Sequence, residues 1–249
     1  MGNNRRLKTL LIATALAVLP ATADDSGLIV EAGASHKLSK VVSTSIDAEF
    51  RTRNDFRTVD RVSVGVDVSY KPLKFLKLTA AYSLLIDNNS EKLTFNEDGS
   101  YNNWRPSYYG TRHRIQVSAT GEWKPVKRLK LSLRERWQYT HRGERDDLRR
   151  YDFDNEWWES TAVLSRNKHV LRSRLQASYD FPKWKFDPTA SVEFFNTMSL
   201  EKTRLTFGTE YDIKKRHTLG IYYRYDIVRG DDDEDTNRHS IGVSYNFKF

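Results

Sequence analysis

Apolar and polar residues alternate with a period of two along most of the chain from Ile46 onward. Segment 61–70 shows the pattern clearly, with Val62, Val64, Val66, Val68 and Tyr70 at even positions and Arg61, Ser63, Gly65, Asp67 and Ser69 at odd positions. Successive side chains of a β-strand leave opposite faces of the sheet, so this alternation predicts strands with one apolar and one polar face. No segment after residue 23 keeps a helical period, and the sequence therefore predicts an all-β protein.

Eleven segments are predicted as strands: 28–37, 41–53, 59–70, 76–87, 110–123, 128–140, 169–181, 185–196, 201–213, 217–228 and 238–249. A soluble β-sandwich would alternate in the same way, but its strands usually have about 5–6 residues. A tilted strand that crosses a membrane needs about 9–11 residues, which is closer to the lengths found here.

The predicted connections alternate in length along the chain. Short turns alternate with longer polar loops. The turns lie at 37–40, 71–74, 124–127, 182–185 and 214–216, and the loops lie near 54–58, 88–109, 142–168, 196–200 and 229–237. Transmembrane barrels keep short turns on the periplasmic side and long loops outside. The pattern favours an antiparallel transmembrane β-barrel of about 10–12 strands over the sandwich.

The strand number raises a difficulty. Antiparallel closure with both termini in the periplasm requires an even number of strands, and eleven is odd. Counting back from Phe249, the segment 28–37 would run inward from the outside. We therefore expect either that this segment lies partly in the lumen or that one further spanning strand is hidden in a long loop.

The N-terminus has the three parts of a secretory signal peptide. Basic residues precede an apolar stretch from Leu10 to Leu19, and Pro20 and a small-residue site ending at Ala23 follow. The apolar stretch of about ten residues is too short to serve as a membrane anchor. We expect residues 1–23 to be a cleaved signal peptide and residues 24–249 to form a single outer-membrane β-barrel domain.

Composition agrees with an exported barrel. The mean hydropathy of −0.70 excludes a bundle of transmembrane helices, and the absence of cysteine excludes disulfides and thiolate metal sites. The formal charge of +8 falls to +5 without the three basic residues of the predicted signal peptide. Because this excess is spread along an exported chain, we expect no nucleic-acid partner.

Five segments carry a resemblance to a known group of proteins: Ala34–Lys40 (ASHKLSK), Asp60–Lys71 (DRVSVGVDVSYK), Thr111–Arg114 (TRHR), Tyr222–Tyr225 (YYRY) and Ser244–Phe249 (SYNFKF). With them the chain resembles an uncharacterised, domain-of-unknown-function family of small outer-membrane β-barrels from Gram-negative bacteria. The resemblance implies a fold and a location in the cell outer membrane, but no active site. It also implies two partners, outer-membrane lipid and the barrel assembly machinery, which would recognise the C-terminal strand ending at Phe249.

Catalysis by a barrel would need a nucleophile or a water molecule beside a general base. By alternation, four histidines share the parity of lipid-facing residues and point outward: His113, His169, His217 and His239. We therefore expect no catalytic residues and a protein that is not an enzyme. The acidic run 231–235 could bind calcium but lacks the spacing of a dedicated calcium loop, so we expect no metal and no cofactor.

The predicted lumen holds the most informative residues. Three pairs of arginines at positions i and i+2 occur on three successive predicted strands, Arg112 and Arg114, Arg134 and Arg136, and Arg172 and Arg174. Period-two spacing places each pair on one face, and alternation assigns that face to the lumen. We expect a basic patch near the outer mouth, which is a candidate anion-binding site because guanidinium groups bind carboxylate, sulfate and phosphate in a bidentate manner.

Three functions follow from this interpretation. In an open lumen the patch predicts a narrow, anion-preferring diffusion channel for small anionic solutes or acidic oligosaccharides, resembling small porins lined with arginine tracks. In a closed lumen the arginines would pair with Glu49, Glu122, Glu193 or Glu210 and form a structural ion-paired core. A surface-binding barrel that acts through its long extracellular loops is the alternative, and an outer-membrane enzyme is a third.

Overall fold

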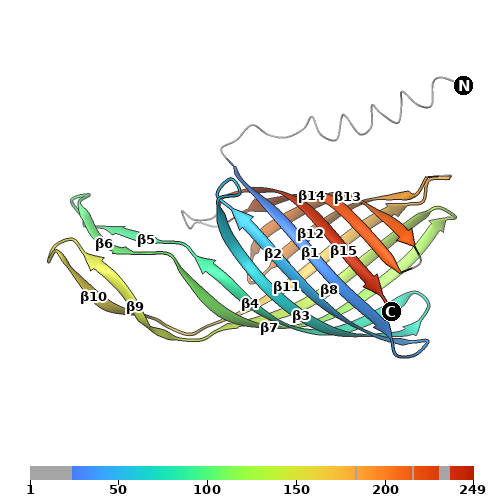
Figure 1. The fold of residues 1–249 in the computed structure, drawn as a ribbon, viewed down its shortest axis with the longest axis horizontal. Coiled ribbons are helices and arrows are strands. Elements are labelled where there is room, and N and C mark those ends of the chain that lie inside the picture. The colour runs from blue at the N-terminus through green and yellow to red at the C-terminus, as the bar shows by residue number, and fades with distance from the viewer. Residues whose placement is uncertain (1–23, 183, 215, 230–235) are drawn as a thin grey trace, which may run out of the picture.

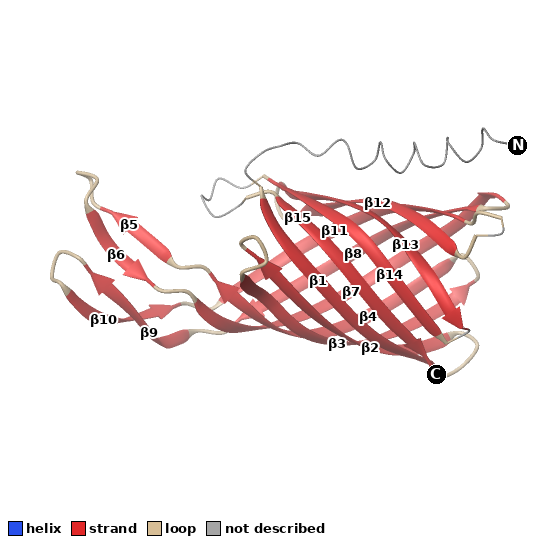
Figure 2. Cartoon of the chain, turned by 45° about the horizontal axis from the view of Figure 1, so that its top comes forward, coloured by secondary structure: helices blue, strands red, loops and turns tan. Residues whose placement is uncertain are grey.

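The computed structural model describes residues 24–182, 184–214, 216–229 and 236–249. The predicted signal peptide and the acidic run 231–235 lie outside these residues. Within them the chain forms β-strands and no helix, as Figure 2 shows. No helix among the described residues is long and apolar enough to cross a membrane.

Eleven strands of the described chain form a closed barrel (Figure 1). Their bounds are β1 Asp25–Lys37, β2 Val42–Arg53, β3 Thr58–Leu73, β4 Leu76–Asn89, β7 Tyr108–Val126, β8 Leu129–Arg142, β11 Arg166–Tyr179, β12 Phe186–Asn196, β13 Leu200–Lys214, β14 His217–Val228 and β15 Arg238–Lys248. Each of the eleven segments predicted from alternation overlaps one of these strands. The all-β barrel prediction is confirmed.

The barrel closes between its first and last strands, and this pair is parallel. All other neighbouring strands of the barrel are antiparallel, including β1 with β2. Figure 1 shows β1 and β15 side by side, both running toward the C-terminus. The expectation of an even strand number is therefore wrong. β1 begins at the long-loop end and pairs with β15, so the barrel closes with eleven strands. β1 therefore lies in the wall and not in the lumen, and the described residues contain no twelfth barrel strand.

The barrel is apolar outside and polar inside. On β3, Val66 is 49% exposed on the outer face, whereas Ser63 is 8% exposed on the inner face. Among the described residues fourteen buried side chains are polar or charged and only five are apolar. A soluble sandwich would show the opposite distribution, because its core is apolar. Lipid contact explains the exposed apolar band, so this is a transmembrane barrel.

The connections differ at the two ends of the barrel. At the short-turn end, where the C-terminus lies, neighbouring strands are joined by a few residues. At the long-loop end, the segments after β4 and β8 leave the barrel and form a second sheet. This sheet consists of β5 Lys92–Phe95, β6 Tyr101–Arg105, β9 Arg145–Asp152 and β10 Trp157–Val163, in the order β10-β9-β6-β5. We call it the extension; it projects beyond the barrel in Figures 1 and 2.

Candidate functional site: the polar lumen

Two cavities lie inside the barrel. The larger has a volume of about 840 Å³ and is lined by residues of the long-loop end, such as Arg142 and Lys168, and by residues farther down, such as Glu210 and Ser244. The smaller has a volume of about 230 Å³ and is lined by Glu122 and Lys130 near the short-turn end. Both cavities are lined by Arg134, Arg136, Arg174 and Gln176, so these residues lie where the two cavities meet.

The wall of the larger cavity carries an excess of positive charge. Its lining contains fifteen lysines and arginines against eight aspartates and glutamates, an excess of seven positive charges. The whole chain has an excess of only eight. The lumen, rather than the outer surface, therefore concentrates the basic character of the protein.

All six arginines of the predicted patch line the larger cavity. Arg112 and Arg114 lie near the long-loop end of β7, as expected. The other four lie in the middle of their strands, Arg134 and Arg136 on β8 and Arg172 and Arg174 on β11. The expected position near the outer mouth is therefore wrong for two of the three pairs. Arg134 already lies at the centre of the predicted strand 128–140, and β11 begins at Arg166, three residues before its predicted start, which moves Arg172 and Arg174 toward the middle.

The strand register brings like charges together. Arg136 lies directly opposite Arg172, and Arg134 lies directly opposite Arg174. Like charges opposite one another destabilise a sheet, so they need a counter-ion. Glu193 on β12 supplies one, since its carboxylate contacts Arg134 at 2.5 Å and Arg172 at 2.9 Å. Its side chain is only 4% exposed, so both ion pairs are enclosed in the wall.

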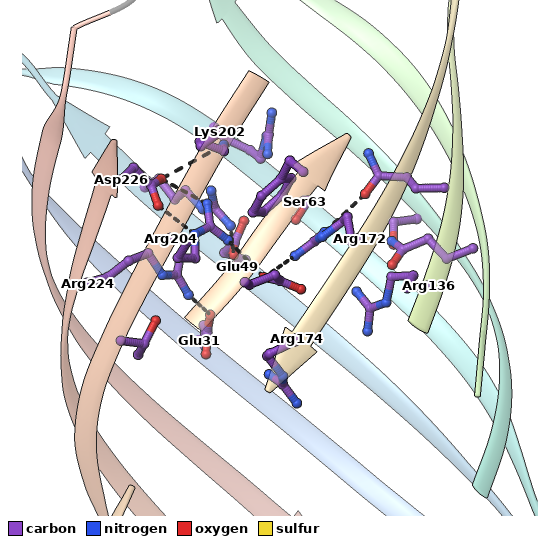
Figure 3. Close-up of a pocket in the computed structure, with 18 of the residues that line it drawn as sticks. Glu31, Glu49, Ser63, Arg136, Arg172, Arg174, Lys202, Arg204, Arg224 and Asp226 are labelled. Atoms are coloured by element: carbon purple, nitrogen blue, oxygen red, sulfur yellow. Dashed lines mark hydrogen bonds and ion pairs between the residues drawn. The ribbon is translucent and has the colours of Figure 1, made fainter. Parts of the chain in front are cut away.

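A second group of ion pairs continues around the wall (Figure 3). Arg204 on β13 makes a bidentate contact with Asp226 on β14, at 2.6 and 2.9 Å, and also lies 4.0 Å from Glu193. Arg224 approaches Glu31 at 3.8 Å. Charge-assisted bidentate contacts are shorter and stronger than neutral hydrogen bonds, so this half of the wall is fixed in place.

Three of the six patch arginines have no carboxylate partner. Arg114, Arg136 and Arg174 make no ion pair with any residue in the described ranges, although Arg114 donates a hydrogen bond to Thr140. The Nε atoms of Arg136 and Arg174 are buried and have no hydrogen-bond partner. Figure 3 shows both residues beside Arg172, facing the cavity. The charges of these two guanidinium groups are therefore not neutralised by any described carboxylate.

The predicted carboxylate partners behave differently from one another. Of the four glutamates, only Glu193 pairs with patch arginines. Glu49 pairs with Arg51, Glu122 lies near Lys71 and Lys130, and Glu210 makes no ion pair within the described chain. The partner of Arg112 is Asp87, at 3.2 Å, which sequence analysis did not select. Asp87 is the last residue of the predicted strand 76–87, and its parity, opposite to that of the lipid-facing residues, could have assigned it to the lumen.

One aromatic ring stands among the lumen cations. Phe195 is buried on β12, two residues beyond Glu193, and its ring centroid lies 4.4 Å from Arg172, 4.5 Å from Lys202 and 5.0 Å from Arg204. Cations are attracted to the face of an aromatic ring, so Phe195 helps to hold three positive groups close together. Phe195 lies two residues after Glu193 and shares its parity, so alternation in the sequence could have assigned its side chain to the lumen.

The histidines lie elsewhere. No histidine within the described ranges lines either cavity. His113 hydrogen-bonds Tyr82 at 2.8 Å, His217 hydrogen-bonds Tyr245 at 2.8 Å, and His239 contacts Tyr223. The tyrosines Tyr82 and Tyr245 are exposed on the outer face of the barrel. These pairs are polar groups of the outer surface, with no lumen nucleophile beside them.

A closed barrel with an apolar outer band and a polar, charged lumen defines the class of transmembrane β-barrel proteins. Within that class, residues 30–238 match the family described as "Protein of unknown function (DUF2490)", and the chain belongs to this family. No curated protein matches the sequence.

Solved structures of β-barrels are similar to this fold. The β-domain of the Bordetella autotransporter Brka has a TM-score of 0.55 and 13% identity, with 84% of this chain and 82% of that chain covered. The translocator domain of the autotransporter NalP from Neisseria meningitidis has a TM-score of 0.55 and 11% identity, with 99% and 96% covered. The NanC porin has 17% identity and a TM-score of 0.46, with 91% and 100% covered. At these identities the comparison concerns the fold alone.

Proposed function

We propose that this protein is a non-enzymatic outer-membrane channel that passes small anions in preference to cations. The location is supported by the predicted signal peptide at residues 1–23 and by the lipid-facing band of the barrel. The long loops and the extension would then lie outside the cell, and the short turns in the periplasm.

The observation that carries the proposal is the uncompensated positive charge at the junction of the two cavities. Arg136 and Arg174 line both cavities and make no ion pair with described residues. A narrow passage with walls of one sign of charge concentrates counter-ions and repels ions of its own sign. A solute that moves from one cavity to the other must pass these two guanidinium groups.

The arrangement also favours a particular kind of anion. Guanidinium groups remain charged at any ordinary pH and match the planar geometry of carboxylates and the oxygens of phosphate and sulfate. The neighbouring arginines of the wall are paired with Glu193 and Asp226. Arg136 and Arg174 can therefore bind an anion without breaking an ion pair. We therefore expect oxyanions and small carboxylates to be preferred to chloride.

Reversal potentials in planar lipid bilayers test the proposal. Under about a tenfold salt gradient the native protein should show anion preference, and the double variant R136S/R174S should lose most of it. The double variant R149S/R150S removes the same charge from the extension, outside both cavities, and should behave like the native protein. A channel that prefers cations, a native protein that does not conduct, or two variants with equal selectivity would refute the proposal.

A further inference from the structure

The extension has a continuous aromatic face. Six rings form a chain across its four strands, with successive centroid distances of 5.5, 5.3, 5.1, 5.5 and 5.7 Å, in the order Phe95, Tyr101, Phe153, Tyr151, Trp158 and Trp104. Trp158, Tyr151, Trp104 and Leu93 are directly paired across β10, β9, β6 and β5, so they share one face. The face is therefore built by the strand register.

No second layer formed by the described residues covers this face. Phe95, Tyr101 and Trp158 are all exposed, Trp158 by 42%. A sheet normally buries its apolar face against another layer of structure. Contiguous exposed aromatic surface commonly marks a binding site. The barrel lies at one end of the extension (Figure 2).

The extension is acidic, in contrast to the lumen. Between residues 90–109 and 143–165 there are ten aspartates and glutamates and five lysines and arginines. The structure pairs two of these carboxylates, Asp147 with Arg145 and Glu159 with Arg150, and the other eight make no ion pair with described residues. Hydrogen bonds from Asn155 lower the pKa of Asp152, and those from Arg145 lower the pKa of Asp147. The surface therefore carries a net negative charge at neutral pH.

One edge of the extension is open. Among the described strands β10 pairs only with β9, and β10 has seven residues, whereas the opposite edge strand β5 has four. An open edge presents unpaired backbone N–H and C=O groups to any extended chain. Peptides that bind by strand addition obtain affinity from these groups and specificity from alternate side chains.

From these four features we propose that the extension docks an extended, cationic polypeptide segment of a partner protein along β10. The segment adds a fifth strand to the sheet, and its basic side chains lie over the aromatic face of this acidic extension. Aromatic faces attract ammonium and guanidinium groups, and Arg149 already lies 5.8 Å from the Trp158 ring. A second copy of this chain would bring two acidic surfaces together, and an acidic polymer would also be repelled. The proposal does not depend on channel activity.

The proposal is tested by calorimetry, which measures the binding of synthetic peptides to the full chain in detergent. The probe is a blocked peptide of about ten residues in which lysine and valine alternate. We expect this peptide to bind, and its affinity to fall with added salt. Replacing the lysines by glutamate, or placing prolines that remove backbone donors, should each weaken binding by about tenfold or more. Equal binding of the glutamate peptide or of the proline peptide would overturn the proposal.

Neighbouring tryptophans on β10 provide a matched pair of variants. Trp158 lies on the aromatic face, and Trp157, which is 60% exposed, lies on the opposite face. W158A should weaken binding of the lysine peptide by about tenfold, and W157A by less than about threefold. Unchanged heat-modifiability of both variants in gels establishes that the barrel remains folded. Equal effects of the two substitutions, or a dimer of the native chain that W158A dissociates, would contradict the proposed partner.

Discussion

The hydroxyl of Tyr222 on β14 donates a hydrogen bond to the carboxylate of Glu31 on β1, at 2.9 Å. The side chain crosses the intervening strand β15 at Gly242, where a Cβ atom would lie 2.0 Å from the Tyr222 ring. Three strands around the parallel closure are thus held together by one aromatic side chain. The glycine is required here by close approach of the ring, not by backbone conformation.

Substitution of Gly242 tests this contact. G242A should lower the free energy of unfolding by about 1–3 kcal/mol, because the Tyr222 ring must move away from the added methyl group. G121A on β7 is the control, since an added Cβ there has no atom within 4 Å. Urea unfolding in detergent measures both. Equal stability of the two variants would show that the ring can shift without cost.

The two faces of β3 should differ in their tolerance of charge. V66R places a cation in the middle of the lipid-facing row and should destabilise the barrel by about 2–4 kcal/mol. D67N changes the next residue, which faces the lumen and accepts hydrogen bonds from Ser45 and Ser69, and should cost less. Unfolding of both variants in lipid vesicles provides the measurement, and equal costs would contradict the assigned faces.

Sequence alternation was sufficient to predict the barrel strands, because a long membrane-spanning strand repeats the same two-residue pattern many times. It also identified the parity of the six arginines. It did not predict the partner of each charge, since the contact between Arg134 and Glu193 depends on three strands being aligned. The extension was missed because its four- and five-residue strands β5 and β6 are too short to show alternation, and the longer β9 (RDDLRRYD) and β10 (WWESTAV) do not alternate. The parallel closure depends on which edge of the sheet β1 joins, and local sequence does not specify this.

The counter-ion of the patch should affect both stability and selectivity. E193Q leaves Arg134 and Arg172 without their carboxylate partner, so we expect a loss of about 3 kcal/mol in unfolding free energy and stronger anion preference. E210Q, in the wall of the same cavity but without an ion pair to any described residue, should change neither property as much. Urea unfolding and reversal potentials are measured on the same preparations. Unchanged stability of E193Q would show that the ion pairs contribute little.

A carboxylate on the outer face provides a further test. Glu135 on β8 lies between the exposed apolar residues Leu133 and Trp137, and its only described hydrogen-bond donor is Ser173, at 2.7 Å. Charged groups on the lipid face destabilise a barrel, so E135L should raise the free energy of unfolding by about 1 kcal/mol. Stability in lipid vesicles is the measurement, with S173A as the control. A lower stability of E135L would indicate that this carboxylate has a stabilising role.

Disulfide trapping tests the parallel closure directly, because the chain contains no native cysteine. Val30 and Val243 are Cα partners across β1 and β15, and both are exposed on the outer face. The double variant V30C/V243C should therefore oxidise to a cross-linked barrel, which migrates differently in gels before and after reduction. In V30C/I241C the second cysteine is displaced by two residues along β15, which separates the Cα atoms beyond the limit of about 7 Å for a disulfide. We expect no cross-link in this control. A cross-link in V30C/I241C but not in V30C/V243C would require a different register, and failure of both pairs would contradict the eleven-stranded barrel.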